Sequence, residues 1–203
     1  MSEFRASPAW PPASNRIRIL DAVTTLLAEN PWPSISLTKV ADEAGVSRQT
    51  IYNEFGDRST LADLYVEFLV DRLVDQHVPV DDEALLVEGD VMHALALVLG
   101  SWFASVVSDP VLGRAFDRSA SGGLFGGLVV DEAALVERTS RRLAERYVVL
   151  APGLPIDRAF PMARVVARLC ISYLLVPAPA GQDPVADLVA VLGPHAVNLF
   201  NET

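Results

Sequence analysis

Residues 36–56 of this chain read SLTKVADEAGVSRQTIYNEFG. Two short helices are predicted here, over 37–44 and 48–55, because a serine that can cap each helix precedes it and a glycine that can end it follows. Gly45 can adopt the left-handed conformation that a sharp turn between helices requires. The residues spaced to close the packing between the helices are small or branched and apolar: Val40, Ala41, Ala44, Val46 and Ile51. The stretch therefore predicts a helix-turn-helix.

The second of these helices leaves polar side chains on its outer surface, namely Arg48, Gln49, Thr50, Tyr52 and Asn53. All of them can hydrogen-bond, and Arg, Gln and Asn are the residue types that contact base edges in the major groove of DNA. A solvated helical hairpin with no ligand is the alternative that this pattern leaves open.

The rest of the chain repeats apolar residues every three or four positions, which predicts an all-α fold. A helix over 15–29, capped by Ser14, precedes the quoted stretch, and a long helix over 60–76, opened by Ser59, follows it. The larger and more apolar second half is predicted to contain helices over 83–107, 110–118, 131–149, 157–176 and 183–200.

Several motifs in and around the quoted stretch resemble the N-terminal domain of the tetracycline-repressor (TetR) family. They are Ile19-Leu20-Asp21-Ala22, Val40-Ala41, Ala44-Gly45-Val46-Ser47 and Thr50-Ile51-Tyr52-Asn53-Glu54-Phe55-Gly56-Asp57-Arg58, followed by Leu61. The resemblance covers about residues 16–65, whereas the second half resembles the family only in its length and helical character.

The polar, Pro-rich N-terminus is expected to be a flexible arm over 1–14. The resemblance implies a three-helix helix-turn-helix DNA-binding domain over 15–77 and a larger α-helical ligand-binding and dimerisation domain over 78–203. It also implies a homodimeric, ligand-responsive transcriptional regulator that binds a near-palindromic operator in double-stranded DNA. Repression is the usual mode in the family, and activation is left open.

Carried over by position, the resemblance implies that Arg48 and Gln49 contact bases, with Asn53 a weaker candidate. Arg58 stands where the family often has Lys and is expected to bind phosphate, while Glu54 stands where His is frequent. The Glu54 carboxylate is expected to point away from DNA or to restrict the bases accepted. The other residues expected at the DNA are Thr38, Lys39, Ser47, Thr50 and Tyr52, although no firm family role transfers to Lys39.

The second half is expected to hold an effector pocket with a mostly apolar lining, which favours a small lipid-like, acyl or aromatic effector. The candidate lining residues are Met92, Leu95, Leu99, Trp102, Phe103, Phe116, Leu124, Phe125, Tyr147, Leu169 and Tyr173. A filled core that uses the same residues is the alternative. The Gly-rich segment 119–128 is expected to be a loop at the pocket entrance or a plain linker.

The helices over 157–176 and 183–200 are the expected dimer helices, by the family's architecture. Their candidate interface residues are Val165, Val166, Leu169, Tyr173, Leu188, Val189, Leu192, Ala196 and Leu199. An intramolecular core built from the same residues is the alternative.

No pattern in the sequence indicates catalysis, a cofactor or a metal site. The 3 His residues lack metal-ligand spacing, the single Cys (Cys170) lies in an apolar helix, and no nucleophile–base constellation is present. Two other function classes stay open: a protein-interaction module that no longer binds DNA and, least favoured, a small helical enzyme.

The formal net charge is -10, which by itself argues against nucleic-acid binding. The placement of cations offsets this total, because Arg16, Arg18, Lys39, Arg48 and Arg58 lie in or beside the helix-turn-helix. We therefore expect DNA binding with weak non-specific affinity and a shallow salt dependence.

Targeting signals and membrane anchors are not predicted. The N-terminal residues lack the apolar core of a signal peptide, and the uncharged run 91–108 is interrupted by polar residues and flanked by acidic ones. We expect this run to be a helix buried in the core of a cytoplasmic protein that has no membrane partner.

Overall fold

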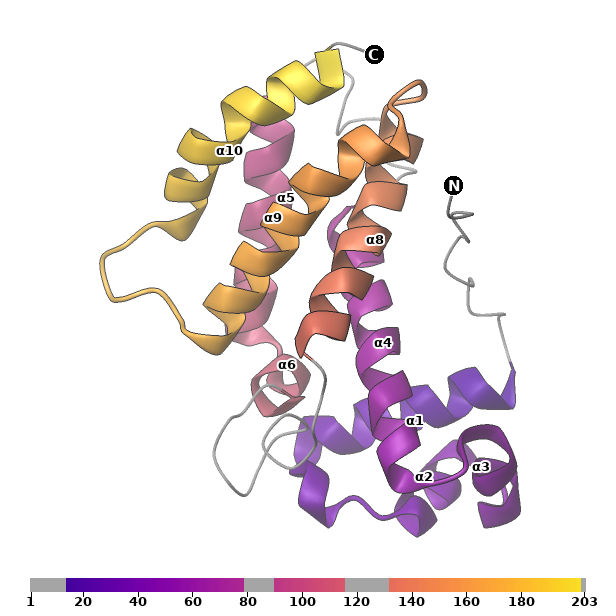
Figure 1. Ribbon diagram of the computed structural model, residues 1–203. Helices are drawn as coiled ribbons and strands as arrows, with labels where there is room; N and C mark the ends of the chain where they lie inside the picture. The colour runs from indigo at the N-terminus through magenta and orange to yellow at the C-terminus, as the bar shows by residue number, and fades with distance from the viewer. Residues whose placement is uncertain (1–13, 79–89, 116–131, 202–203) are drawn as a thin grey trace. The chain divides into compact units, whose positions relative to one another are not determined.

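A computed structural model describes residues 14–78, 90–115 and 132–201 (Figure 1). These residues form helices and connecting loops, with no strand among them, so the predicted all-α fold is confirmed. The helices are α1 (Asn15–Glu29), the 3₁₀ turn η1 (Trp32–Ser34), α2 (Leu37–Ala44), α3 (Arg48–Phe55), α4 (Arg58–His77), α5 (Val91–Ser108), α6 (Pro110–Ala115), α8 (Glu132–Leu150), α9 (Ile156–Leu175) and α10 (Pro184–Asn201).

The chain divides into two compact units. The helix-turn-helix unit contains α1, η1, α2, α3, the first part of α4 through Leu69, and α6. The C-terminal unit contains the rest of α4 from Val70, together with α5, α8, α9 and α10.

In the helix-turn-helix unit, α1 is capped as predicted, since the Ser14 Oγ accepts a hydrogen bond from the Ile17 amide at 3.3 Å. Its apolar stripe, including Ile19, Val23 and Leu27, is fully buried, and α1 packs against both α2 and α6. Burial of this stripe stabilises α1, because short helices are marginal by themselves.

The start of α4 differs from the prediction. Asp57, not Ser59, caps the helix: its carboxylate accepts hydrogen bonds from the Thr60 amide at 2.8 Å and from the Ser59 hydroxyl at 2.7 Å. These hydrogen bonds, that of the Thr60 amide first, lower the pKa of Asp57. Aspartate and serine both favour the cap position, so the choice between neighbouring candidates depends on the turn itself.

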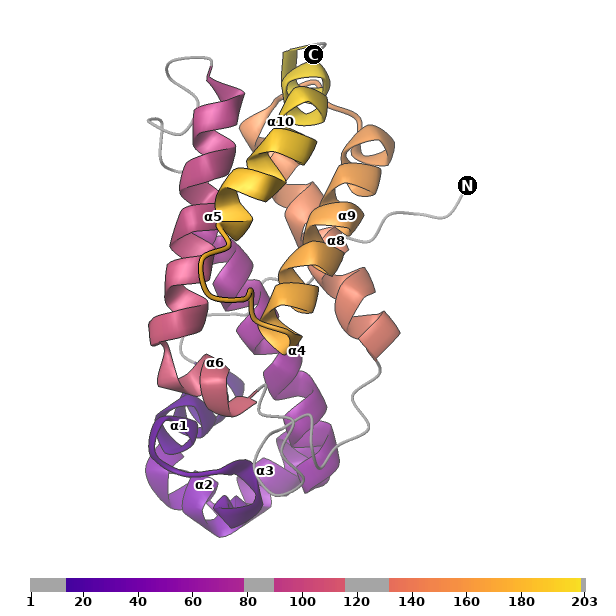
Figure 2. The same cartoon turned by 90° about the vertical axis from the view of Figure 1, so that its left-hand side faces the viewer.

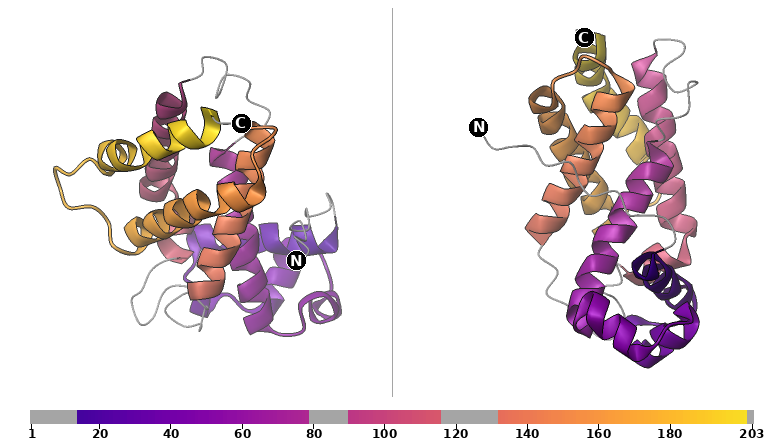
Figure 3. Two further views of the ribbon diagram at one scale, coloured as in Figure 1. Left: turned by 45° about the horizontal axis from the view of Figure 1, so that its top comes forward. Right: turned by 90° about the vertical axis from the view of Figure 1, so that its right-hand side faces the viewer.

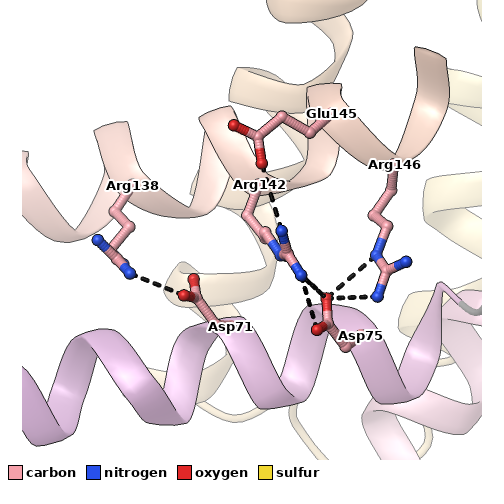
Figure 4. A network of polar contacts seen from close by, with 6 residues as sticks. All are labelled: Asp71, Asp75, Arg138, Arg142, Glu145 and Arg146. Carbon is pink, nitrogen blue, oxygen red and sulfur yellow. Dashed lines mark hydrogen bonds and ion pairs between the residues drawn. The ribbon is translucent and has the colours of Figure 1, made fainter. Parts of the chain in front are cut away.

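In the C-terminal unit, α8 and α9 form a helical hairpin and lie side by side along much of their length (Figure 2). The second half of α4 lies along α8, and an ion network joins the two helices (Figure 4). Asp75 accepts hydrogen bonds from Arg142 at 2.7 Å and from Arg146, while Asp71 pairs with Arg138 at 2.7 Å. Burial by itself would lower the pKa of Arg142, but its pKa is raised, because Asp75 pairs with it.

Helices α5 and α10 of the same unit lie close together, as the two views of Figure 3 show. A Cβ atom built on Gly193 of α10 would lie 2.0 Å from the Met92 sulfur of α5, so the lack of a side chain at Gly193 admits the methionine. The imidazole Nδ1 of His77 at the end of α4 is hydrogen-bonded to the Ser101 hydroxyl of α5 at 2.8 Å.

The predicted bounds of the later helices change little. α8, α9 and α10 begin and end within one residue of the predicted positions. The helix predicted over 83–107 begins later, at Val91, because the Asp90 carboxylate accepts a hydrogen bond from the His93 amide and caps it there. The remaining predictions, on 1–13, 83–89, 116–118 and the Gly-rich 119–128, lie outside the described residues.

The expectation that residues 91–108 form a buried core helix holds for one face of α5 only. Val91, Ala94 and Leu99 are buried, whereas Leu97 and Val107 are 53% and 87% exposed. By length and composition α5 is apolar enough to cross a membrane, with a mean hydropathy of 1.7. The core of the C-terminal unit covers one side of a helix that is apolar all round.

Candidate nucleic-acid interface

The helix-turn-helix has the bounds that the sequence predicts. The Ser36 hydroxyl accepts a hydrogen bond from the Lys39 amide at 3.2 Å and caps α2, and the Ser47 hydroxyl accepts one from the Thr50 amide at 3.0 Å and caps α3. Between them Gly45 adopts the left-handed conformation, with φ 63° and ψ 37°. The Val46 amide then bonds back to the Ala41 carbonyl at 3.0 Å, which closes the turn.

The inner faces of α2 and α3 hold the motif rigid. Val40, Ala41 and Ala44 of α2 are buried, as are Ile51 and Phe55 of α3. The packing between the two helices therefore uses every apolar position that the sequence analysis assigned to it except Val46, which is half-buried. A fixed inner face fixes the direction in which the outer face of α3 presents its side chains.

That outer face is polar and accessible. Arg48, Gln49 and Asn53 are exposed, and Tyr52 is 45% exposed. The Gln49 side-chain amide donates a hydrogen bond to the Asn53 carbonyl oxygen at 2.9 Å, so these two amides lie one turn apart on the same side of α3. Such a row has the donors and acceptors that read base edges.

The remaining predicted DNA-contacting residues surround this row. Ser47 is exposed and Thr50 half-buried, with their hydroxyls 2.9 Å apart. Thr38 and Lys39 are exposed on α2, and the Lys39 Nζ donates a hydrogen bond to the Ser34 carbonyl at 3.0 Å. Glu54 is half-buried.

Arg58 has a structural role that sequence reasoning missed. Its guanidinium lies over the Trp32 ring at 4.5 Å and donates hydrogen bonds to the carbonyls of Ile35 at 3.1 Å and Trp32 at 2.5 Å. Burial lowers the pKa of this guanidinium. The contacts tie the start of α4 to the loop before α2, so a phosphate contact by Arg58 would have to use the N–H groups of Nη1 or the second N–H of Nη2.

Two further arginines of the predicted cationic cluster also contact groups within the unit. Arg18 donates a hydrogen bond from Nη2 to the Ala44 carbonyl at 2.7 Å, at the C-terminal end of α2, where a cation is favoured. Arg16 lies over the Phe55 ring at 5.2 Å. No local sequence signal points to the Arg58 contact, because Trp32 and Arg58 are 26 residues apart in the chain.

Comparison with known families agrees with this geometry. Residues 19–64 match the model of the bacterial regulatory proteins of the tetR family, and residues 90–194 match that of the bacterial tetracyclin repressor C-terminal domain. The chain belongs to the TetR family. It is therefore a transcriptional regulator with a DNA-binding helix-turn-helix, and the family resemblance seen in the sequence is confirmed.

One curated relative and two solved structures are similar to this chain over most of its length. The HTH-type transcriptional regulator AlkX of Mycobacterium tuberculosis is 36% identical over 182 residues, 89% of this chain and 84% of the relative. The crystal structure of the TetR family repressor AlkX from Dietzia, implicated in biodegradation of n-alkanes, has a TM-score of 0.75 at 25% identity and covers 96% of this chain and 100% of that one. RolR in complex with resorcinol shares the fold, with a TM-score of 0.60 at 18% identity over 93% and 94% of the two chains.

The C-terminal unit of this TetR-family regulator contains a cavity of about 60 Å³, lined by residues of α5, α8, α9 and α10 and by Val78. Of the predicted pocket residues, Leu95 and Tyr147 line it. Trp102 and Phe103 instead form an aromatic cluster with Tyr173 of α9, at ring-centroid distances of 4.9 and 5.2 Å. The other predicted lining residues divide between Met92, Leu99 and Leu169, which do not line this cavity, and Phe116, Leu124 and Phe125, which lie outside the described residues.

Several residues predicted at the dimer interface are core residues of the single chain. Val166, Leu188, Leu192, Ala196 and Leu199 are each at most 7% exposed, so they present little surface to a partner. The remaining predicted interface residues are more accessible: Val165 is 45% exposed, and Leu169, Tyr173 and Val189 are half-buried. Apolar periodicity marks the buried face of a helix without saying whether its own chain or a second one covers it.

Proposed function

We propose that this TetR-family regulator is a homodimeric repressor that binds a near-palindromic operator through α3 and is released by a small, apolar effector. The observation that carries the operator-binding part is the outer face of α3, where Arg48, Gln49 and Asn53 are exposed above a buried apolar face. A helix held in this way fits the major groove, and a dimer would place two such helices in successive grooves.

In the proposed complex Arg48 and Gln49 contact bases, because an arginine fork matches guanine and a carboxamide matches adenine. Asn53 supports Gln49 through the hydrogen bond between them. The hydroxyl groups of Thr38, Ser47, Thr50 and Tyr52, with the ammonium of Lys39, contact phosphates and set the register of the protein on the duplex.

The AlkX relatives suggest which genes are regulated. The Dietzia repressor is implicated in biodegradation of n-alkanes, and the cavity of the present chain is almost entirely apolar in its lining. We propose that this regulator acts in the cytoplasm on genes for the metabolism of aliphatic compounds and that an aliphatic molecule is the effector.

Selection of binding sites from random duplex, followed by fluorescence anisotropy, tests the operator-binding proposal. Arg48→Ala and Gln49→Ala are each expected to cost about 1–3 kcal/mol of binding free energy on the selected operator and to relax base preference at one position. Arg158→Ala, which removes an exposed arginine of α9, is the matched control and should leave operator affinity unchanged.

The outcome separates the function classes. Equal losses on the operator and on random duplex would contradict base contacts by Arg48 and Gln49. A wild-type protein that selects no duplex at all would favour the protein-interaction alternative. Light scattering tests the dimer independently, and a strict monomer at micromolar concentration would rule it out.

A further inference from the structure

Among the residues that the structure describes, one polar side chain lines the cavity of the C-terminal unit. Tyr147 of α8 is the exception among lining residues that are otherwise Val, Ala, Leu, Met and Phe. They include Val98 of α5, Met162 of α9 and Phe200 of α10. Any molecule bound here therefore meets an apolar surface with a single hydrogen-bonding group.

The Tyr147 side chain is nine-tenths buried, and its ring packs edge-on against Phe200 at 5.7 Å. Within the described part of the chain its hydroxyl has no hydrogen-bond partner, since its contacts are those of the ring. Burial raises the pKa of this phenol, which stays neutral and able to donate a hydrogen bond. A largely buried tyrosine usually finds a partner for its hydroxyl, so the Tyr147 hydroxyl in the cavity wall is placed to hydrogen-bond a ligand.

The chemistry of the wall selects among aliphatic ligands. A plain alkane would fill apolar space but leave the hydroxyl of Tyr147 unpaired. A carboxylate would be buried without a cation, because none of the described lining residues is charged and the neighbouring Arg146 is paired with Asp75. A neutral oxygen avoids both costs.

We infer that the cavity binds a neutral aliphatic molecule carrying one oxygen atom, of the primary-alcohol or aldehyde class, whose oxygen accepts a hydrogen bond from the Tyr147 hydroxyl. This inference rests on the proposed function, since it names the chemical class of the proposed effector. The cavity volume of about 60 Å³ is room for only a few water-sized groups. It therefore holds the oxygen and the first carbons, and a longer chain requires the cavity to widen.

The test compares three six-carbon probes, n-hexane, 1-hexanol and hexanoate, in ligand-observed NMR titrations of the full chain. Tyr147→Phe removes only the hydroxyl and is expected to weaken 1-hexanol binding about tenfold while leaving n-hexane binding unchanged or tighter. Hexanoate at neutral pH should bind more weakly than 1-hexanol. Tyr65→Phe is the matched control, because it removes a hydroxyl that donates a hydrogen bond to Thr24 in the other unit; its affinities should equal those of the wild type.

Two results would overturn the inference: 1-hexanol affinity that does not depend on Tyr147, or hexanoate as the tightest of the three probes. Release of the selected operator, measured with the same probes, separates this inference from the proposed function. Tyr147-dependent binding of 1-hexanol without release leaves the inference standing and contradicts the effector role. Release of the operator by n-hexane in both the wild type and Tyr147→Phe would contradict the inference and leave the effector role standing.

Discussion

The unpaired hydroxyl of Tyr147 is a cost to the ligand-free protein. A fully buried hydroxyl without a partner costs about 1–3 kcal/mol; the Tyr147 hydroxyl lines the cavity, so its cost lies at or below the lower end, and phenylalanine keeps the ring contact with Phe200. Tyr147→Phe is therefore expected to raise the free energy of unfolding by about 1 kcal/mol, which for a chain of this size raises Tm by roughly 2–4 °C. Urea denaturation without ligand measures it, and a clear loss of stability would show that the hydroxyl has a partner in the folded chain.

His77 makes the stability of the protein depend on pH. Burial lowers the pKa of its imidazole below the ordinary 6.5, so the neutral ring is favoured in the folded state. As the pH falls through 6.5, the unfolded chain takes up a proton that the folded chain does not, and stability is lost towards the lower, folded-state pKa. The contribution of Asp57, whose pKa is also lowered, falls in a separate window below its ordinary 3.8.

We expect the free energy of unfolding to fall between pH 7.5 and pH 5.5 in the wild type, and to fall less in His77→Gln. Urea denaturation at several pH values is the measurement. His195→Gln is the control, because this histidine is exposed on α10 and its removal should keep the wild-type pH dependence. Identical pH profiles for the wild type and His77→Gln would contradict the assignment of this pH dependence to His77.

At the scale of elements, the ion network between α4 and α8 depends on Asp75. The Asp75 carboxylate pairs with both Arg142 and Arg146, whose side chains are 18% and 16% exposed. Asp75→Asn would leave two neighbouring guanidiniums without their shared anion. Because the Asp75 side chain is 39% exposed and water screens it in part, the expected loss of stability is about 1–2 kcal/mol.

Urea denaturation checks this loss against Glu137→Gln on the same α8. The Glu137–Arg141 pair is exposed and 3.7 Å apart, so its removal should change stability by less than about 0.5 kcal/mol. If Asp75→Asn and Glu137→Gln were equally stable, the network would contribute no more to stability than an exposed ion pair does.

Local signals explain how much of the fold could be predicted. The bounds of α1, α2 and α3 follow from serine caps and from Gly45, which act through contacts within a few residues. The parts that could not be predicted depend on distant partners. The Arg58 contact with Trp32 spans 26 residues, and the burial of Leu192 depends on which chain covers α10.

The candidate site also has a part that could be predicted from the sequence and a part that could not. The exposure of Arg48, Gln49 and Asn53 follows from helical periodicity alone, because the apolar residues of α3 fix its buried face. The cavity lining combines positions from several helices, and periodicity cannot say which of their apolar residues meet around a space. This is why Leu95 and Tyr147 could be named in advance, whereas Val98, Met162 and Phe200 were not.

At the scale of the whole molecule, the question is how a chain of net charge -10 binds a polyanion. Within the described helix-turn-helix unit, Lys39 and Arg48 are exposed on α2 and α3, and Lys39 donates one hydrogen bond, to the Ser34 carbonyl. Arg18 is exposed on α1, but its guanidinium, like those of Arg16 and Arg58, contacts groups of the unit itself. A dimer would thus bring about four accessible cations to the duplex, helped by the amino-terminal ends of α2 and α3.

Few accessible cations predict a shallow salt dependence of binding. Each phosphate neutralised contributes about −0.9 to the slope of log K against log salt concentration, so the expected slope for the selected operator is about −4. Fluorescence anisotropy between 50 and 200 mM salt measures it, with Lys39→Ala expected to make the slope shallower by roughly two because both subunits of the dimer lose a cation. Gln49→Ala, which removes no charge, should weaken binding without changing the slope. A slope near −10, or strong binding to random duplex at physiological salt, would mean that cations outside this face reach the DNA.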